Sequence, residues 1–158
     1  MKRIVVYILS LAAAMMVPLE GTDVGKLQPV ELVQIYKEGD FVVIVTDTGD
    51  SGQGHGVEAA FEDLEETTAG IIFLDTADYL LVSASAIGEV PALQNYLKSG
   101  VRVCKAEKGI DLVQAAEFLK VHPPRVKLKE PDSVRNAQTL TQENDRVKLS
   151  DEKDEKRG

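Results

Sequence analysis

Short apolar runs alternate with segments of helical periodicity between residues 30 and 122, and this alternation constrains the fold more than any other feature. Residues 30–36 and 41–45 are β-rich, and Glu38-Gly39-Asp40 between them is a turn signal, so the two runs predict a hairpin. Residues 57–68 then place apolar side chains at helical spacing with carboxylates opposite, which predicts an amphipathic helix.

The same alternation continues toward the carboxyl terminus. Strands are expected at residues 71–74, 79–82 and 101–104, and helices at residues 91–97 and 112–119. Asp111 is placed as the N-cap of the last helix. The order β-β-α-β-α-β-α predicts a single α/β (α+β) domain, with a mixed sheet of about four to five strands and about three helices.

The amino terminus has the pattern of an export signal. Lys2 and Arg3 supply positive charge, residues 4–17 carry none, and Pro18 follows. An uncharged run of this length is short for a membrane-spanning helix and fits the apolar region of a secretory signal. Residues 1–20 are therefore expected to be a signal peptide or an amino-terminal membrane anchor, which makes the protein extracytoplasmic, either secreted or membrane-anchored.

The opposite end is dominated by charge. Apolar residues become sparse after about Arg125, and residues 150–158 are almost all charged. Such a segment buries too little apolar surface to offset the entropy of ordering it. The prediction is a folded domain over 27–122 followed by a disordered tail over 123–158.

Composition excludes several classes of function. The net charge of −8 argues against nucleic acid as the main partner. One cysteine, Cys104, and two histidines, His55 and His122, exclude a disulfide framework or a Cys/His zinc cluster within one chain. No cofactor is expected, and the sequence identifies no small-molecule ligand.

The most suggestive segment is residues 47–56, in which glycine recurs at every second or third position. We expect a flexible, exposed connector between a strand and a helix, and such loops often make contacts with partners. The residues expected to make that contact are Asp47, Asp50, His55 and Glu58.

Two chemical alternatives use the same segment. Asp47-Thr48-Gly49 after an apolar strand is the pattern of an aspartic-peptidase loop, with Asp47 catalytic and a second chain supplying the other carboxylate. The twelve residues from Asp47 to Glu58 also match an EF-hand loop in part, with Gly52 at position 6 and Asp47, Ser51 and Glu58 as calcium ligands.

The order of these segments resembles the amino-terminal domain of the spore germinant-receptor C-subunit family. The resemblance starts at Glu31-Leu32-Val33-Gln34-Ile35-Tyr36 and at the helix beginning Val57-Glu58-Ala59-Ala60-Phe61, and it continues through residues 74–88, 91–97 and 101–119. It covers about residues 30–120 and rests on order and spacing. Members of that family are usually lipoproteins with further domains, whereas this chain has no lipobox cysteine.

The resemblance implies an exported, membrane-associated, non-enzymatic domain from a spore-forming bacterium. Such a domain would act through contact with membrane-associated proteins, in sporulation or spore germination. The functional prediction is therefore a protein–protein contact module, with the aspartic peptidase and the calcium-binding module as alternatives.

Overall fold

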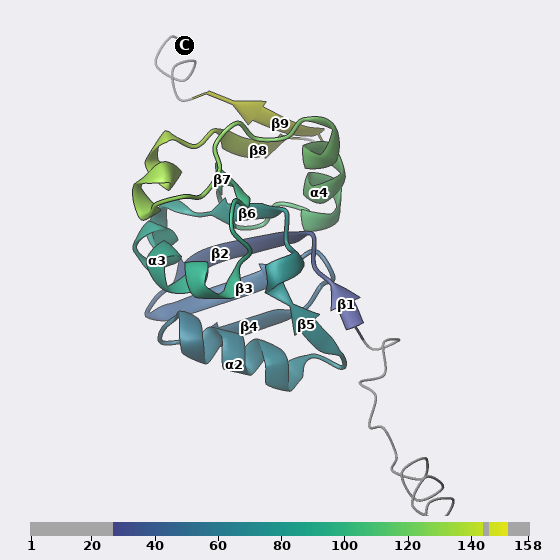
Figure 1. The fold of residues 1–158 in the computed structure, drawn as a ribbon, viewed down its shortest axis with the longest axis vertical. Helices are drawn as coiled ribbons and strands as arrows, with labels where there is room; N and C mark the ends of the chain where they lie inside the picture. Colours follow the sequence, from purple (N-terminus) through teal and green to yellow (C-terminus); the bar gives the residue numbers. More distant parts are fainter. Residues whose placement is uncertain (1–26, 144–145, 152–158) are drawn as a thin grey trace, which may run out of the picture.

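The computed structural model describes residues 27–143 and 146–151, and these form one mixed α/β domain around a seven-stranded sheet (Figure 1). The strands of this sheet are β2 (Leu32–Glu38), β3 (Phe41–Thr46), β4 (Ser51–Gly54), β6 (Tyr79–Val82), β7 (Arg102–Ala106), β8 (Thr139–Glu143) and β9 (Arg146–Ser150). They lie in the order β4-β3-β2-β6-β7-β8-β9. Strands β2, β6, β7 and β8 are parallel, whereas β3, β4 and β9 run antiparallel to their neighbours. A separate parallel pair joins β1 (Leu27–Pro29) to β5 (Ile71–Phe73).

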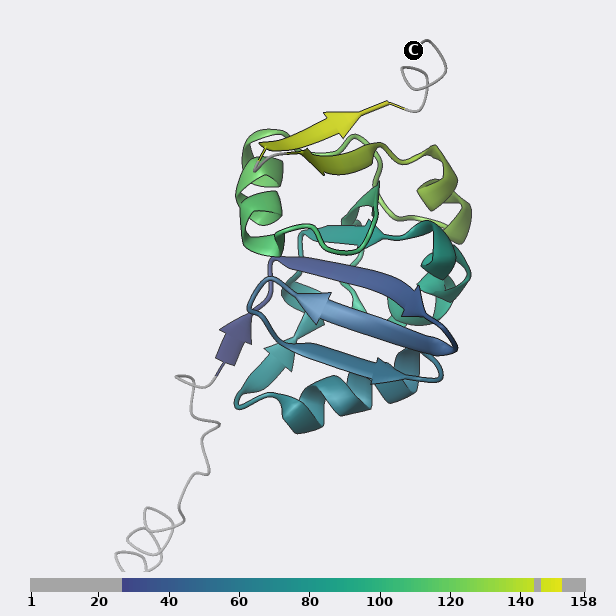
Figure 2. The same cartoon turned by 180° about the vertical axis from the view of Figure 1, so that it is seen from behind.

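The sheet separates two buried apolar clusters. The helical elements are α2 (Val57–Thr67), α3 (Val90–Leu93), α4 (Leu112–Val121) and the 3-10 turns η3 (Ala84–Glu89) and η5 (Pro131–Asn136). Residues of α2, η3, α3 and η5 enter the cluster on one face, whereas α4 alone among these elements enters the cluster on the other. Figure 2 shows the domain from behind, with β2, β3 and β4 in front and α2 below them. The connection after β6 and the connection after β7 therefore lead to opposite faces of the sheet.

The mixed α/β domain and its central elements are confirmed. Strands β2 and β3 form the predicted hairpin, with Ile35 opposite Ile44. Asp111 caps α4 as expected, because its carboxylate accepts hydrogen bonds from the backbone N–H groups of Val113 and Gln114, each at 3.0 Å. The helix expected over residues 91–97 is interrupted: α3 ends at Leu93 and a 3-10 turn follows over Gln94–Tyr96.

The predicted number of strands is too low, and one missed strand lies in the glycine-spaced segment. Residues 47–50 form a turn, but β4 then pairs with β3, so the segment is not a flexible connector. Gly52 and Gly54 face α2 at very close range. A Cβ atom on Gly52 would lie 2.2 Å from the carbonyl oxygen of Ala60, and one on Gly54 would lie 2.5 Å from the amide nitrogen of Ala60. These glycines allow a helix to pack against a strand.

The prediction of a disordered tail over residues 123–158 is also wrong for much of its length. Residues 131–136 form η5, and β8 and β9 extend the sheet beyond β7. Few apolar side chains suffice here, because the exposed side of β7 supplies hydrogen-bonding partners and Val134, Ala137 and Leu140 are buried. Residues 152–158 lie outside the described part of the chain.

The predicted signal peptide or anchor over residues 1–20 also lies outside the described residues. Within the part of the chain that the structure describes, no helix is long and apolar enough to cross a bilayer.

Candidate functional site

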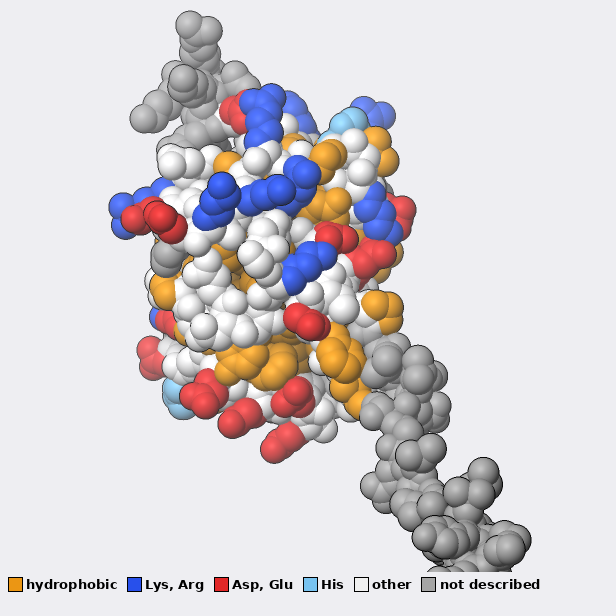
Figure 3. Space-filling view, viewed as in Figure 1, with side chains coloured by type: hydrophobic (Ala, Val, Ile, Leu, Met, Phe, Trp, Pro, Cys, Tyr) orange, Lys and Arg blue, Asp and Glu red, His pale blue; other side chains and the backbone are white. Residues whose placement is uncertain are grey.

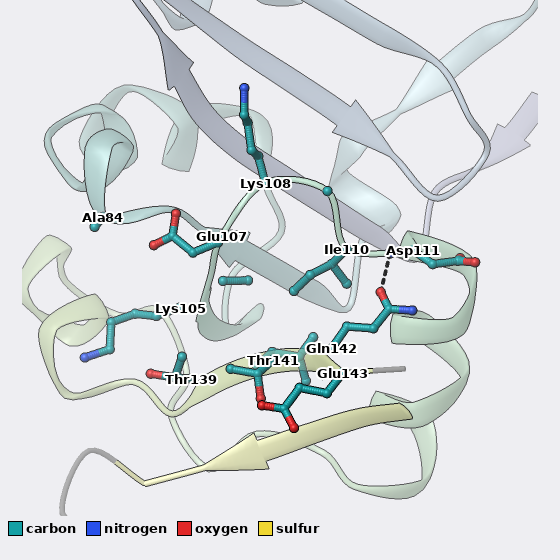
Figure 4. A pocket seen from close by; sticks show the side chains of 13 residues that line it. Ala84, Lys105, Glu107, Lys108, Ile110, Asp111, Thr139, Thr141, Gln142 and Glu143 are labelled. Atoms are coloured by element: carbon teal, nitrogen blue, oxygen red, sulfur yellow. Dashed lines mark hydrogen bonds between the residues drawn. The ribbon is translucent and has the colours of Figure 1, made fainter. Parts of the chain in front are cut away.

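A cleft of about 1060 Å³ lies at the carboxyl ends of β6, β7 and β8 (Figure 4). Parallel sheets bind ligands at the carboxyl ends of their strands, at the point where the connections after two neighbouring strands leave toward opposite faces. Here β6 leads into η3 on one face and β7 leads toward α4 on the other. The strand topology therefore creates an opening at the carboxyl ends of these strands. It is lined by Ala84 of η3, by residues 105–111 and by residues 139–143.

The loop between β7 and α4 forms one wall of the cleft and is held at several points. The buried side chain of Gln34, on β2, donates from Nε2 to the backbone oxygen of Glu107 at 2.9 Å. Gly109 has a φ of 91°, a conformation that favours glycine and lets the loop turn into α4. Lys108 forms an ion pair with Glu38 at 2.9 Å. These contacts fix the loop against β2.

Strand β8 forms the opposite wall. Leu140 points into the α4-side core, so alternation along the strand turns the side chains of Thr139, Thr141 and Glu143 to the other face of the sheet. Gln142 bridges the two walls, because its Oε1 accepts a hydrogen bond from the backbone N–H of Asp111 at 2.8 Å (Figure 4). The cleft thus has two linked walls and hydroxyl and carboxylate groups along them.

The cations of the cleft already have partners, whereas two of its carboxylates do not. Lys108 points away from the opening toward Glu38 (Figure 4), and Lys105 donates from Nζ to the carbonyl oxygen of Arg135 at 3.3 Å. The side chains of Glu107 and Glu143 are exposed, on opposite walls, and neither pairs with a cation among the described residues. The cleft can therefore offer two carboxylates to a cationic group.

The residues that line this cleft carry no cysteine, serine or histidine. Its hydroxyl groups belong to Thr139 and Thr141, and no imidazole lies among its lining side chains to act as their base. Charged and polar side chains are thus the main groups that this cleft presents.

Asp47, the candidate catalytic residue, lies at the amino end of β2, whereas the cleft lies at the carboxyl ends of the parallel strands. Its Oδ1 accepts hydrogen bonds from the backbone N–H groups of Glu31 and Leu32, at 3.1 and 3.2 Å. Partial burial raises the pKa of the Asp47 carboxyl above its ordinary value, although these two hydrogen bonds act in the opposite direction. The carboxylate is thus used to fix the start of β2.

The other expected contact residues are spread around β4 and α2. Asp50 accepts a hydrogen bond from the hydroxyl of Thr48 at 2.7 Å. His55 stacks on Phe41 with ring centroids 4.6 Å apart. Glu58 is exposed in the first turn of α2. Figure 3 shows carboxylates gathered over α2 at this end of the molecule and lysine and arginine side chains gathered toward the other end.

The calcium alternative finds no assembled ligand set. Asp47 is bonded to backbone amides, and Ser51 is paired with Val45 in the sheet. Within residues 27–143 and 146–151, no three histidine, cysteine or acidic side chains group as metal ligands do.

Sequence reasoning missed the cleft itself. Its signal is the polar run Glu107-Lys108-Gly109 between an apolar strand and the cap of a helix, which is where parallel strands place their ligand-binding loops. The second wall is β8, which lies in the segment predicted to be disordered.

No family model, no characterised protein and no solved structure matches the chain.

Proposed function

We propose that this protein is a non-enzymatic binding module that acts through protein–protein contact. Its binding site is the cleft at the carboxyl ends of β6, β7 and β8, and its partner is a polypeptide segment that carries a cationic side chain. One observation carries this proposal: Glu107 and Glu143 face one cleft from opposite walls without a cation to pair with among the described residues.

The polar lining of the cleft favours a polypeptide segment over a small molecule. Pockets for small ligands usually enclose about 300–1,000 Å³ and bury most of the ligand in apolar walls. This cleft reaches about 1060 Å³, and charged or polar side chains make up much of its lining. A lysine or arginine side chain between the carboxylates would form charge-assisted hydrogen bonds, with Thr139 and Thr141 as further polar contacts.

The location of the protein is part of the same proposal and rests on the sequence alone. The charged and apolar pattern of residues 1–20 supports export, and the order of segments over residues 30–120 supports a membrane-associated partner in spore germination. Fractionation of cells that express the full chain tests it: a product found wholly in the cytosol at full length would contradict export.

Binding is tested by titrating the full chain, labelled with ¹⁵N, with a tetralysine peptide. The amide resonances of residues 107–111 and 139–143 are expected to shift together and to saturate. In the double variant Glu107→Gln and Glu143→Gln these shifts should be lost, because the amide keeps the shape of each side chain and removes its charge.

The matched control is Glu65→Gln with Glu66→Gln, which removes two exposed carboxylates from α2 and leaves the cleft unchanged. This control should bind the peptide at the cleft as the unaltered chain does. Shifts confined to α2, or cleft shifts that persist in the Glu107 and Glu143 variant, would contradict the proposed site.

A further inference from the structure

The two outer strands of the sheet, β4 and β9, differ in how their free sides are protected. At the β4 edge, the backbone N–H of Gln53 donates to Oδ2 of Asp63 on α2 at 2.8 Å, and the hydroxyl of Thr67 donates to the backbone oxygen of Ser51 at 3.3 Å. Helix α2 thus occupies backbone groups of this edge with its own side chains. Capping of this kind prevents another strand from pairing there.

The β9 edge has no such cover among the described residues. The N–H of Lys105 on β7 donates to the carbonyl of Gln138 at 2.8 Å, while Lys105 is in register with Thr139. Gln138 and Leu140 therefore direct their backbone groups toward β7, and Thr139, Thr141 and Glu143 direct theirs toward β9.

The register of β8 with β9 then decides which groups of β9 point outward. Lys148 is opposite Thr141 and Arg146 is opposite Glu143, so the backbone groups of these two basic residues point toward β8. The N–H and carbonyl groups of Val147 and Leu149 face away from the sheet. No hydrogen bond joins them to any residue that the structure describes.

The side chains of β9 differ between its two faces. Val147 and Leu149 pack against the α4-side core, and beside them lies a groove of about 390 Å³ whose walls include Phe118 of α4 and His122, the residue that follows α4. Arg146 and Lys148 project from the other face, are exposed, and form no ion pair with a described residue.

We propose that β9 receives an extended segment of a protein partner as an eighth strand of the sheet. The backbone of that segment bonds to the outward N–H and carbonyl groups of Val147 and Leu149. Its side chains opposite those two residues are apolar and enter the groove beside Phe118, and its side chain opposite Lys148 is acidic. The recognised pattern is thus an alternation of apolar and acidic residues.

The charge of the strand selects this occupant over a second copy of the chain. Two copies of β9 paired antiparallel about their centres would place Lys148 opposite its own equivalent, and like charges directly opposite are destabilising. An acidic side chain at that position instead pairs with Lys148. The groove beside Phe118 lies on the α4 face of the sheet, whereas Lys148 lies on the other face, opposite Thr141 of the carboxyl-end cleft.

The test uses the full chain and a synthetic heptapeptide of alternating valine and glutamate with threonine at both ends. Saturable binding is expected, together with slower hydrogen exchange at the amides of Val147 and Leu149. Replacing Lys148 with Glu should weaken binding by about fivefold, the size expected when an opposite-charge cross-strand pair becomes a like-charge pair. A second peptide with lysine in place of glutamate should restore the affinity of this variant.

Two further variants separate this contact from other effects. Lys127→Glu reverses another exposed cation that has no ion pair among the described residues, and it should bind the glutamate peptide as the unaltered chain does. Glu107→Gln alone removes a cleft carboxylate on the wall that does not adjoin β9 and should also bind this peptide, so failure at the cleft and failure at β9 can be distinguished.

Val147→Pro removes an outward N–H and should weaken binding while circular dichroism shows the fold retained. Unchanged exchange at Val147 and Leu149 in saturating peptide would overturn the proposal. So would concentration-dependent dimerisation of the unaltered chain that Val147→Pro abolishes, since a second copy would then be the occupant.

Discussion

Asp63 on α2 accepts a hydrogen bond from the backbone N–H of Gln53 on β4, over 2.8 Å. This contact is possible because α2 lies almost directly on β4, where Gly52 and Gly54 present no side chain. The glycines at positions 52 and 54 thus have a packing cause, and its consequences can be measured.

A methyl group at Gly52 or Gly54 should destabilise the protein. In Gly52→Ala the added carbon would lie 2.2 Å from the backbone oxygen of Ala60, so helix and strand must separate. We expect each substitution to lower the free energy of unfolding by about 1–3 kcal/mol, as measured by urea denaturation. Gly88→Ala is the control, because a Cβ there meets nothing within 4 Å and stability should barely change.

Loss of the Asp63 carboxylate should open the β4 edge locally. Asp63→Ala leaves the N–H of Gln53 without its partner, and we expect the free energy of unfolding to fall by about 0.5–1.5 kcal/mol. Hydrogen exchange at the Gln53 amide should accelerate more than at the amides of β2. Glu62→Ala, at the exposed neighbouring position, should change neither quantity. An equal effect of the two substitutions would show that charge on α2 matters, and not this hydrogen bond.

Asp47 should stabilise the fold through its hydrogen bonds, and its charge should oppose stability. Asp47→Ala leaves the N–H groups of Glu31 and Leu32 without an acceptor, so we expect a loss of about 1–3 kcal/mol. Asp47→Asn keeps an oxygen acceptor and should lose less. These free energies are obtained from urea denaturation at neutral pH.

The raised pKa of Asp47 also gives a signed pH dependence. The folded state binds the proton of this carboxyl more tightly than the unfolded state, so its contribution to stability is complete below the ordinary value of 3.8 and is lost as pH rises through the folded pKa. The stability of Asp47→Asn relative to the unaltered chain should therefore improve from below about pH 3.8 to near pH 7. A change of the opposite sign would show that the two N–H groups outweigh burial.

Cys104 should be inert in the folded protein. Its side chain is fully buried in β7, and burial raises the pKa of the thiol to about 12. The thiolate is the reactive form, so a colorimetric thiol reagent at neutral pH should react only as fast as the protein unfolds. Reaction in urea supplies the positive control, and rapid reaction of the folded chain would show that β7 opens on its own.

The elements that could be predicted from the sequence are those that are marked by residues within or next to the element itself. The hairpin of β2 and β3 has apolar runs around a turn signal, and Asp111 caps α4 through its own side chain. Strand β4 could not be found in this way, because alternating glycines carry no apolar pattern. These glycines make room for α2, and the contact between α2 and β4 depends on the tertiary fold and not on the local sequence.

The carboxyl-terminal hairpin was missed for a related reason. Strand β8 has one buried apolar side chain, Leu140, among polar residues, and Val147 and Leu149 of β9 are only half-buried. Pairing of β8 with β7 and of β9 with β8 orders these strands, and no local sequence pattern records those pairings. The cleft depends on β8, so it could not be predicted either, although the loop of residues 107–111 was visible after an apolar strand.

The ladder between β7 and β8 makes residues beyond α4 part of the domain. A chain shortened to end at His122 would leave Lys105 without the carbonyl of Gln138 as acceptor and remove Leu140 from the core beneath α4. Such a fragment would expose a bare parallel strand at its new border, prone to pairing with other chains. Any dissection of this protein for binding work should therefore keep the chain through Asp151, whose carboxylate bonds to Gln138 and Arg125 and fastens the last strand to the loop after α4.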